Sequence, residues 1–182
     1  MGYKKVVKTF EKFLHDDDFY PLRDRLLSDD FNWFHREKQV AWDTQPFIDY
    51  FTHSIYNNHE ITSDYYHLII PFLKKMNVRA IISIRVNLVT MKHERVVSDF
   101  HIDYEYKDSK TAIYYLNTNN GYTEFEDGSK VGCRANRYIQ FPSNLKHRGV
   151  SQTDMRIKSV ININFFTPHL NSNGEAEKNC DK

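Results

Sequence analysis

The spacing of hydrophobic residues changes partway along this chain. In 6–14, and again in 64–76, apolar side chains recur at intervals of three or four positions, which is helical spacing. A run of aspartates predicts the cap of another short helix over 16–27. Pro71 interrupts the 64–76 pattern and predicts a kink there. We therefore expect residues 1–76 to be mixed in secondary structure, with more helix than strand.

Residues 78–166 show a different pattern, in which short apolar runs alternate with turn residues. Asp127-Gly128 lies between two of these runs and favours the tight turn of a β-hairpin. Short strands with regular turn signals are typical of an all-β sandwich or jelly roll. The predicted strands are 78–89, 95–101, 111–117, 122–125, 129–131, 137–141 and 156–166.

Composition limits the classes of protein that this chain can belong to. Its 182 residues suffice for one domain, and aromatic residues make up 15% of them, enough for a substantial core. A net charge of +1 gives no sign of a general electrostatic hold on nucleic acid, so we expect no such partner. Cys133 and Cys180 lie far apart and form no disulfide framework. Without a long apolar run or a secretory signal, we expect a cytoplasmic location and no membrane partner.

Two histidines and one aspartate are candidate ligands of a metal ion. In an extended chain, residues two apart point to the same side, so His101 and Asp103 can converge on one ion. His147, which follows a predicted turn after an apolar strand, is the best candidate for a third ligand. Two histidines and one carboxylate on one face leave open positions on an octahedral ion. This arrangement is the pattern of non-haem Fe(II) oxygenases.

One face of the predicted strand 156–166 carries cations and amides instead of apolar side chains. With a period of two, Arg156, Lys158 and Asn162 share this face, whereas the opposite face is rich in isoleucine. A cation beside an iron site could hold the distal carboxylate of 2-oxoglutarate. In 111–117, only one of two adjacent tyrosines can face inward, where its phenol could bond the same carboxylate.

The order of these motifs resembles that of the Fe(II)/2-oxoglutarate-dependent dioxygenases. The motifs are H-x-D at 101–103, A-I-Y-Y-L-N at 112–117, G-Y-T-E-F at 121–125, F-P-S-N-x-x-H-R-G at 141–149 and R-x-K-x-V-I-N-I-N at 156–164. The chain most resembles the compact prolyl-hydroxylase-like branch, and it is also similar to the small oxygenases encoded by marine phages. The segment F-T-H-S-I-Y at 51–56 extends the resemblance more loosely toward the N-terminus.

The resemblance implies a role for each candidate residue. His101, Asp103 and His147 match the iron ligands of the family. Tyr115 matches the tyrosine that holds the 2-oxoglutarate carboxylate. Two ways of counting place the family's basic anchor at Lys158 or at Arg156, and we prefer Lys158.

The resemblance also implies a fold, which is mainly β with N-terminal helices and a double-stranded β-helix (jelly roll, cupin-like) core. Where many relatives carry a tyrosine followed by a proline, this chain has Val89 and Thr90, which weakens the case for a second phenol near the iron. The implied boundaries are 1–169 for a single oxygenase domain, 1–77 for its helical support, 78–166 for its core and 170–182 for a polar tail.

The function implied by the resemblance is hydroxylation of a C–H bond with Fe(II), 2-oxoglutarate and O₂, releasing succinate and CO₂. We expect the substrate to be a peptidyl side chain, prolyl by analogy, or a free amino acid or small metabolite. For a phage enzyme the location would be the host cytoplasm. Two alternatives remain: a non-catalytic jelly-roll module that binds a partner, and a cupin-type metalloenzyme that does not use 2-oxoglutarate. The presence of Asp103 and of the basic anchor Lys158 argues against both.

Overall fold

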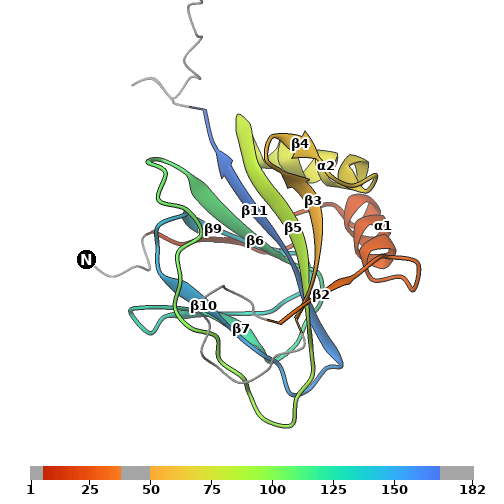
Figure 1. Ribbon diagram of the computed structural model, residues 1–182, viewed down its shortest axis with the longest axis vertical. Helices are drawn as coiled ribbons and strands as arrows, with labels where there is room; N and C mark the ends of the chain where they lie inside the picture. Colours follow the sequence, from red (N-terminus) through yellow and green to blue (C-terminus); the bar gives the residue numbers. More distant parts are fainter. Residues whose placement is uncertain (1–5, 38–49, 169–182) are drawn as a thin grey trace, which may run out of the picture.

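The computed structural model describes residues 6–37 and 50–168, which form a mainly β protein with two antiparallel sheets (Figure 1). No helix within these two ranges is long and apolar enough to cross a membrane. The elements in chain order are β1 (Lys8–Phe10), α1 (Asp16–Leu26), β2 (Phe34–Arg36), β3 (Tyr50–Asn57), β4 (Glu60–Ile61), α2 (Tyr66–Met76), β5 (Ala80–Thr90), β6 (Lys110–Tyr115), β7 (Tyr122–Phe125), β8 (Lys130–Gly132), β9 (Arg137–Pro142), β10 (His147–Val150) and β11 (Ile157–Phe166).

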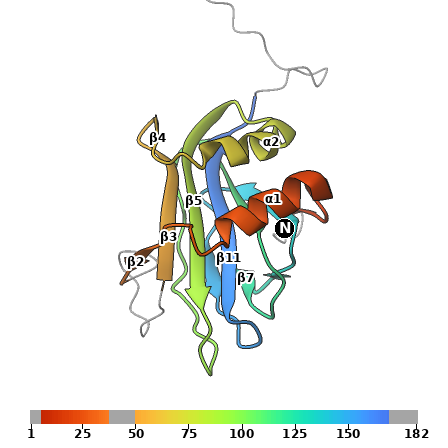
Figure 2. The same ribbon diagram turned by 90° about the vertical axis from the view of Figure 1, so that its right-hand side faces the viewer.

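The larger sheet has the strand order β1-β9-β6-β11-β5-β3-β2, with β4 paired to β3, and the smaller sheet has the order β10-β7-β8. Helices α1 and α2 lie across one face of the larger sheet, over β5 and β11 (Figure 2). On the other face, Phe125 of β7 packs in one apolar cluster with Ile113 and Phe141 of the larger sheet. The larger sheet is therefore a middle layer between the helices and the smaller sheet.

Alternation along β11 explains these layers. Ile161, Ile163 and Phe165 are fully buried in the cluster that includes Phe72 of α2 and Leu22 of α1. The intervening residues point to the opposite, concave face of the sheet. The two chemically different faces predicted for this strand are confirmed, and the concave face is where the candidate site lies.

Both helices fall in predicted segments. Helix α1 begins with three aspartates, which suit the positive end of a helix dipole, and the His15 ring accepts from the Asp17 N–H. Helix α2 begins at Tyr66, and the Ser63 hydroxyl accepts from the backbone N–H of Tyr65 just before it. The helix continues unbroken past Pro71.

Two predicted elements are wrong. Residues 6–14 do not form a helix: β1 pairs with β9, and Lys12 has a φ of 46°, which an α-helix does not contain. Residues 95–101 do not form a named strand. Their backbone pairs with β10 in two isolated bridges, Val97 to Val150 and His101 to His147, which differ by one residue in register. The extra residue interrupts the ladder, as in a β-bulge.

The N-terminal third also contributes strands that the helical expectation missed. β3, which contains the F-T-H-S-I-Y segment, pairs with β5 along most of its length. It is flanked on its other side by β2. The concave face of the larger sheet therefore extends into residues that precede 78–166. The predicted tail at 170–182 lies outside the described residues.

Candidate functional site

Backbone hydrogen bonds bring the three predicted metal ligands together. His101 and His147 exchange two of them, each N–H donating to the other's carbonyl at 2.9 Å. The N–H of Asp103 donates to the carbonyl of Ser143 at 3.0 Å. The irregular segment that carries His101 and Asp103 is thus fastened to the first residue of β10 and to the turn that precedes it. Side chains from two segments that are distant in the sequence are thus held at one point by main-chain contacts.

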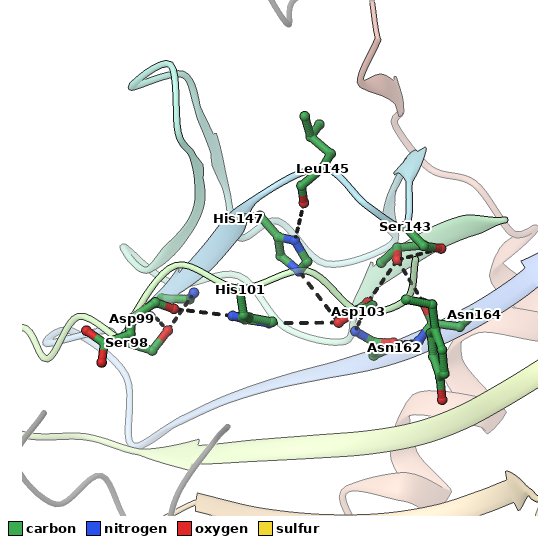
Figure 3. A network of polar contacts seen from close by, with 12 residues as sticks. Ser98, Asp99, His101, Asp103, Ser143, Leu145, His147, Asn162 and Asn164 are labelled. Atoms are coloured by element: carbon green, nitrogen blue, oxygen red, sulfur yellow. Dashed lines mark hydrogen bonds and ion pairs between the residues drawn. The ribbon is translucent and has the colours of Figure 1, made fainter. Parts of the chain in front are cut away.

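The candidate ligand atoms of His101, Asp103 and His147 all lie within 4.8 Å of one another. Nε2 of His101 is 3.8 Å from Oδ1 of Asp103, and Nε2 of His147 is 4.0 Å from the same oxygen. Figure 3 shows both rings turned toward this carboxylate. These separations are too long for direct hydrogen bonds and suit groups that share a central cation.

Each imidazole has its other nitrogen next to a backbone carbonyl. Nδ1 of His147 is 3.0 Å from the carbonyl oxygen of Leu145, and Nδ1 of His101 is 3.3 Å from that of Asp99. A carbonyl oxygen can only accept, so we assign the hydrogen of each neutral ring to Nδ1. The lone pair is then on Nε2, the atom that faces Asp103. This is the tautomer that a metal ligand needs.

The Asp103 carboxylate divides its two oxygens between different tasks. Its Oδ2 accepts hydrogen bonds from the Thr111 hydroxyl at 2.8 Å and from the Asn162 amide at 3.2 Å. Its Oδ1 is the atom that faces the two histidines. Partners on β6 and β11 therefore hold the carboxylate by the oxygen that does not face the histidines. Outer partners of this kind fix the direction of a ligand and strengthen metal binding.

Electrostatics favour a neutral His147. Complete burial lowers the pKa of this ring, and the neighbouring His101 lowers it further, while the Asp103 carboxylate opposes both. Two neutral nitrogens and one carboxylate on one side of a point fit a divalent transition metal with open positions on the other side, such as Fe(II). The chemistry of the donor set therefore fits the predicted iron.

A narrow cavity of about 70 Å³ adjoins this cluster, and Lys158 lies in its wall together with His101, His147 and Thr123. The ammonium of buried Lys158 donates to the carbonyls of Val150 at 2.8 Å and of Tyr122 at 3.2 Å. Burial lowers the pKa of Lys158, and no carboxylate among residues 6–37 and 50–168 pairs with it. A buried cation without a counter-ion calls for an anionic ligand.

The other predicted anchors lie further from the cavity. Arg156 is exposed and precedes the first residue of β11, and it is not among the cavity walls. Tyr115 is buried and faces inward, as predicted for one tyrosine of the pair, while Tyr114 packs toward the helices. The Tyr115 hydroxyl lies 2.7 Å from the hydroxyl of Thr123, and it is Thr123 that lines the cavity.

Sequence reasoning missed one phenol in the cavity wall. Tyr50, the first residue of β3, lines the cavity and lies directly opposite Val89 of β5. Val89 is the position at which the resemblance implies a tyrosine, so in this structure the neighbouring strand β3 supplies a phenol directly opposite that position. Burial raises the pKa of Tyr50 far above its usual value, which keeps the hydroxyl protonated. Only the pairing of β3 with β5 reveals this residue.

Comparisons with known proteins find likeness in structure alone. No protein-family model and no curated protein sequence matches the chain. The epimerase SnoN from nogalamycin biosynthesis, described as non-heme and alpha ketoglutarate dependent, superposes with a TM-score of 0.62 and 12% identity over 91% of this chain and 79% of its own.

Two prolyl hydroxylases are also similar. The prolyl-4-hydroxylase of Pseudomonas putida gives a TM-score of 0.54 and 14% identity over 88% of this chain and 92% of its own. A prolyl hydroxylase from Trichoplax adhaerens, in complex with a hypoxia inducible factor peptide fragment, gives a TM-score of 0.59 and 12% identity over 90% of this chain and 84% of its own. At these identities the likeness establishes the fold, which this chain shares with oxygenases.

Proposed function

We propose that this protein is an Fe(II)- and 2-oxoglutarate-dependent dioxygenase that hydroxylates a C–H bond and releases succinate and CO₂. One observation carries this proposal. The buried ammonium of Lys158 has no carboxylate partner within residues 6–37 and 50–168, and it lines the same narrow cavity as His101 and His147, which with Asp103 form a facial donor set. A metal site and an anion site in the walls of one small cavity suit a co-substrate with a carboxylate at each end.

Each side chain has a definite task in this proposal. Nε2 of His101, Nε2 of His147 and Oδ1 of Asp103 would hold the metal. Lys158 would bind the distal carboxylate of 2-oxoglutarate, and Tyr115 would act through the Thr123 hydroxyl. The chemistry supplied by the bound metal and O₂ is oxidative decarboxylation of 2-oxoglutarate, coupled to insertion of one oxygen atom into the substrate C–H bond.

The proposal includes the finer features of the fold. The two sheets would be the halves of a double-stranded β-helix within one domain over 1–169. The shared fold with oxygenases and the apolar cluster between the sheets support this assignment. A cytoplasmic location, expected from the lack of a long apolar run or secretory signal, and a kinship with phage oxygenases, expected from the motifs, are part of this proposal.

The substrate would be a peptidyl side chain, prolyl by analogy, or a small molecule. Two structural neighbours are prolyl hydroxylases, one of them bound to a peptide, and SnoN belongs to the biosynthesis of a small molecule. The narrow cavity admits only a small ligand, so the prime substrate needs another space beside it.

The decisive experiment measures succinate released from 2-oxoglutarate after anaerobic loading with Fe(II) and admission of air. We expect slow succinate formation by the wild-type protein and none by Asp103→Ala, which loses a metal ligand. Asp24→Ala, an exposed change on α1, is the control and should behave as wild type. Wild-type protein that binds Fe(II) but neither binds 2-oxoglutarate nor forms succinate would refute the proposal and favour a non-catalytic binding module or a cupin-type enzyme.

A further inference from the structure

A second and wider cleft adjoins the cavity. Its volume is about 1060 Å³, and its walls include Arg36, Tyr50, Thr52, Ser54 and Arg85. Tyr50 lines both spaces, so the phenol marks the boundary between them. The cleft is large enough for a drug-sized or peptidic ligand, whereas the cavity is not.

Strand register places one wall of this cleft on the concave face, on the same side of the sheet as Asn162, while its other walls come from the edge of the sheet and the residues around the start of α2. Arg85 of β5 is directly opposite Asn162 of β11 on one side and Ser54 of β3 on the other. Directly opposite residues of an antiparallel pair point to the same side of the sheet. Arg85 therefore shares the face of Asn162, whose amide donates to the Asp103 carboxylate. By the same register, Arg36 of β2 shares the face of Tyr50.

The cleft is positively charged. Asp64 is the only carboxylate in its described walls, against three arginines. Arg25 is already engaged, since it lies 3.7 Å from the Asp30 carboxylate and over the ring of Tyr65. Arg36 and Arg85 are exposed and have no ion-pair partner among the described residues.

Arg85 and Arg36 both influence the pKa of the Tyr50 hydroxyl. Burial raises the pKa of Tyr50 most strongly, and Arg85 and Arg36 each act to lower it, while the Asp103 carboxylate acts to raise it. Strand register agrees with this placement, because Arg36 lies directly opposite Tyr50 and Arg85 lies directly opposite Asn162. The two arginines lie near the entrance of the proposed catalytic centre and not on a remote surface.

We propose that the prime substrate carries an oxyanion, a carboxylate or a phosphate, that Arg85 binds with assistance from Arg36. A guanidinium presents a planar set of donors that matches these groups in a bidentate manner. The substrate would lie along β3 and β5 with its anion over Arg85 and its reacting carbon toward the metal ligands. This inference rests on the proposed function for the identity of the metal site and deepens it by naming the substrate class.

The test uses three small probes with the same ring: benzoate, phenyl phosphate and the neutral benzamide. Binding to the full chain, loaded with redox-inert Zn(II) and saturated with 2-oxoglutarate, is measured by ligand-observed saturation-transfer NMR. We expect at least one anion to bind about tenfold or more tightly than benzamide. The anion that binds more tightly distinguishes a carboxylate from a phosphate substrate.

Arg85→Gln should weaken binding of the preferred anion by about tenfold, because it removes the charge and the paired donors. Arg134→Gln removes an exposed arginine of another loop and should have no effect. Equal binding of all three probes, no binding of either anion, or equal binding by Arg85→Gln and Arg134→Gln would overturn the inference. Calorimetry of 2-oxoglutarate on the same Zn(II)-loaded sample keeps the two proposals separate. If 2-oxoglutarate binds and the anions do not, only the substrate inference fails.

Discussion

Gly121 has no side chain, and Lys158 packs against the space that a Cβ at this position would fill. A Cβ added at Gly121 would lie 3.2 Å from Cδ of Lys158 and 2.9 Å from the backbone oxygen of Val150, to which the Lys158 ammonium donates. The backbone at Gly121 does not have a left-handed φ, so the requirement for glycine here is one of space. The position of the buried ammonium thus depends on the absence of one methyl group.

Gly121→Ala should therefore weaken 2-oxoglutarate binding. The new methyl group cannot move the main chain of Val150 easily, so the side chains of Lys158 and of Asn119, whose Oδ1 would lie 2.8 Å away, must shift. We expect at least a tenfold loss of affinity by calorimetry on the Zn(II)-loaded protein, and a loss of roughly 1–3 kcal/mol in unfolding free energy. Gly132→Ala is the matched control, because the nearest atom to its Cβ would be Nη1 of Arg137, 3.9 Å away. Equal affinity of the two variants would contradict this account of Lys158.

The charge on Lys158 predicts a pH dependence. Burial lowers its pKa in the free protein, and only the protonated ammonium can pair with a carboxylate. Binding of 2-oxoglutarate should therefore weaken as the pH rises through the lowered pKa of Lys158. The sign follows because the bound anion stabilises the ammonium, so complex formation takes up a proton at high pH.

Lys158→Arg is the control for this pH profile. A guanidinium stays protonated across the range from about pH 6.5 to pH 9.5, so the variant should bind 2-oxoglutarate with little change over that range. Both proteins are compared by calorimetry with Zn(II) present, so that any effect of hydroxide on the metal is common to the pair. Identical profiles for the wild type and Lys158→Arg would exclude Lys158 as the titrating group.

The hydrogen bonds that orient the Asp103 carboxylate through its Oδ2 lead to a prediction for metal affinity. Thr111→Val removes the hydroxyl that donates to Oδ2 of Asp103 at 2.8 Å and leaves the three ligands in place. Loss of such an outer partner typically costs about 10–100-fold in metal affinity, which competition with a chelator would measure. Thr9→Val, an exposed change on β1, should leave the affinity unchanged. A metal affinity of Thr111→Val equal to that of Thr9→Val would mean that the hydroxyl does not orient the ligand.

The three ligand candidates could be predicted because their signals are local. His101 and Asp103 are two residues apart, and His147 follows a turn that the sequence marks plainly. The structure brings them within 4.8 Å, although the segment of His101 is an interrupted bridge and not the strand expected. Two hydrogen bonds at His101 were enough to hold the geometry that a full strand would have given.

Other features of the site could not be predicted because they depend on pairing between distant segments. Tyr50 reaches the cavity through the register of β3 against β5, and Arg85 shares the face of Asn162 through the register of β5 against β11. The apolar spacing of residues 6–14 predicts a helix, but β1 within this segment makes its backbone hydrogen bonds with β9. Local periodicity cannot report which partner strand satisfies the backbone.

The last prediction concerns Asn136, which joins the N-terminal segment to the middle of the fold. Its buried amide donates to the carbonyl of Leu14 at 2.9 Å and its Oδ1 accepts from the Leu14 N–H at 2.8 Å. The same oxygen accepts from the Tyr114 hydroxyl at 2.7 Å, and the residue has a left-handed φ of 60°. Asparagine is one of the few residues that tolerate this φ.

Asn136→Ala should lower the unfolding free energy by roughly 3 kcal/mol, since it leaves three buried polar groups without partners at about 1 kcal/mol each. Asn58→Ala is the control for backbone strain alone, because Asn58 has a φ of 51° on an exposed turn. We expect a much smaller loss there, and chemical denaturation would measure both. Equal losses in the two variants would show that the left-handed backbone, and not the buried hydrogen bonds, accounts for the role of Asn136.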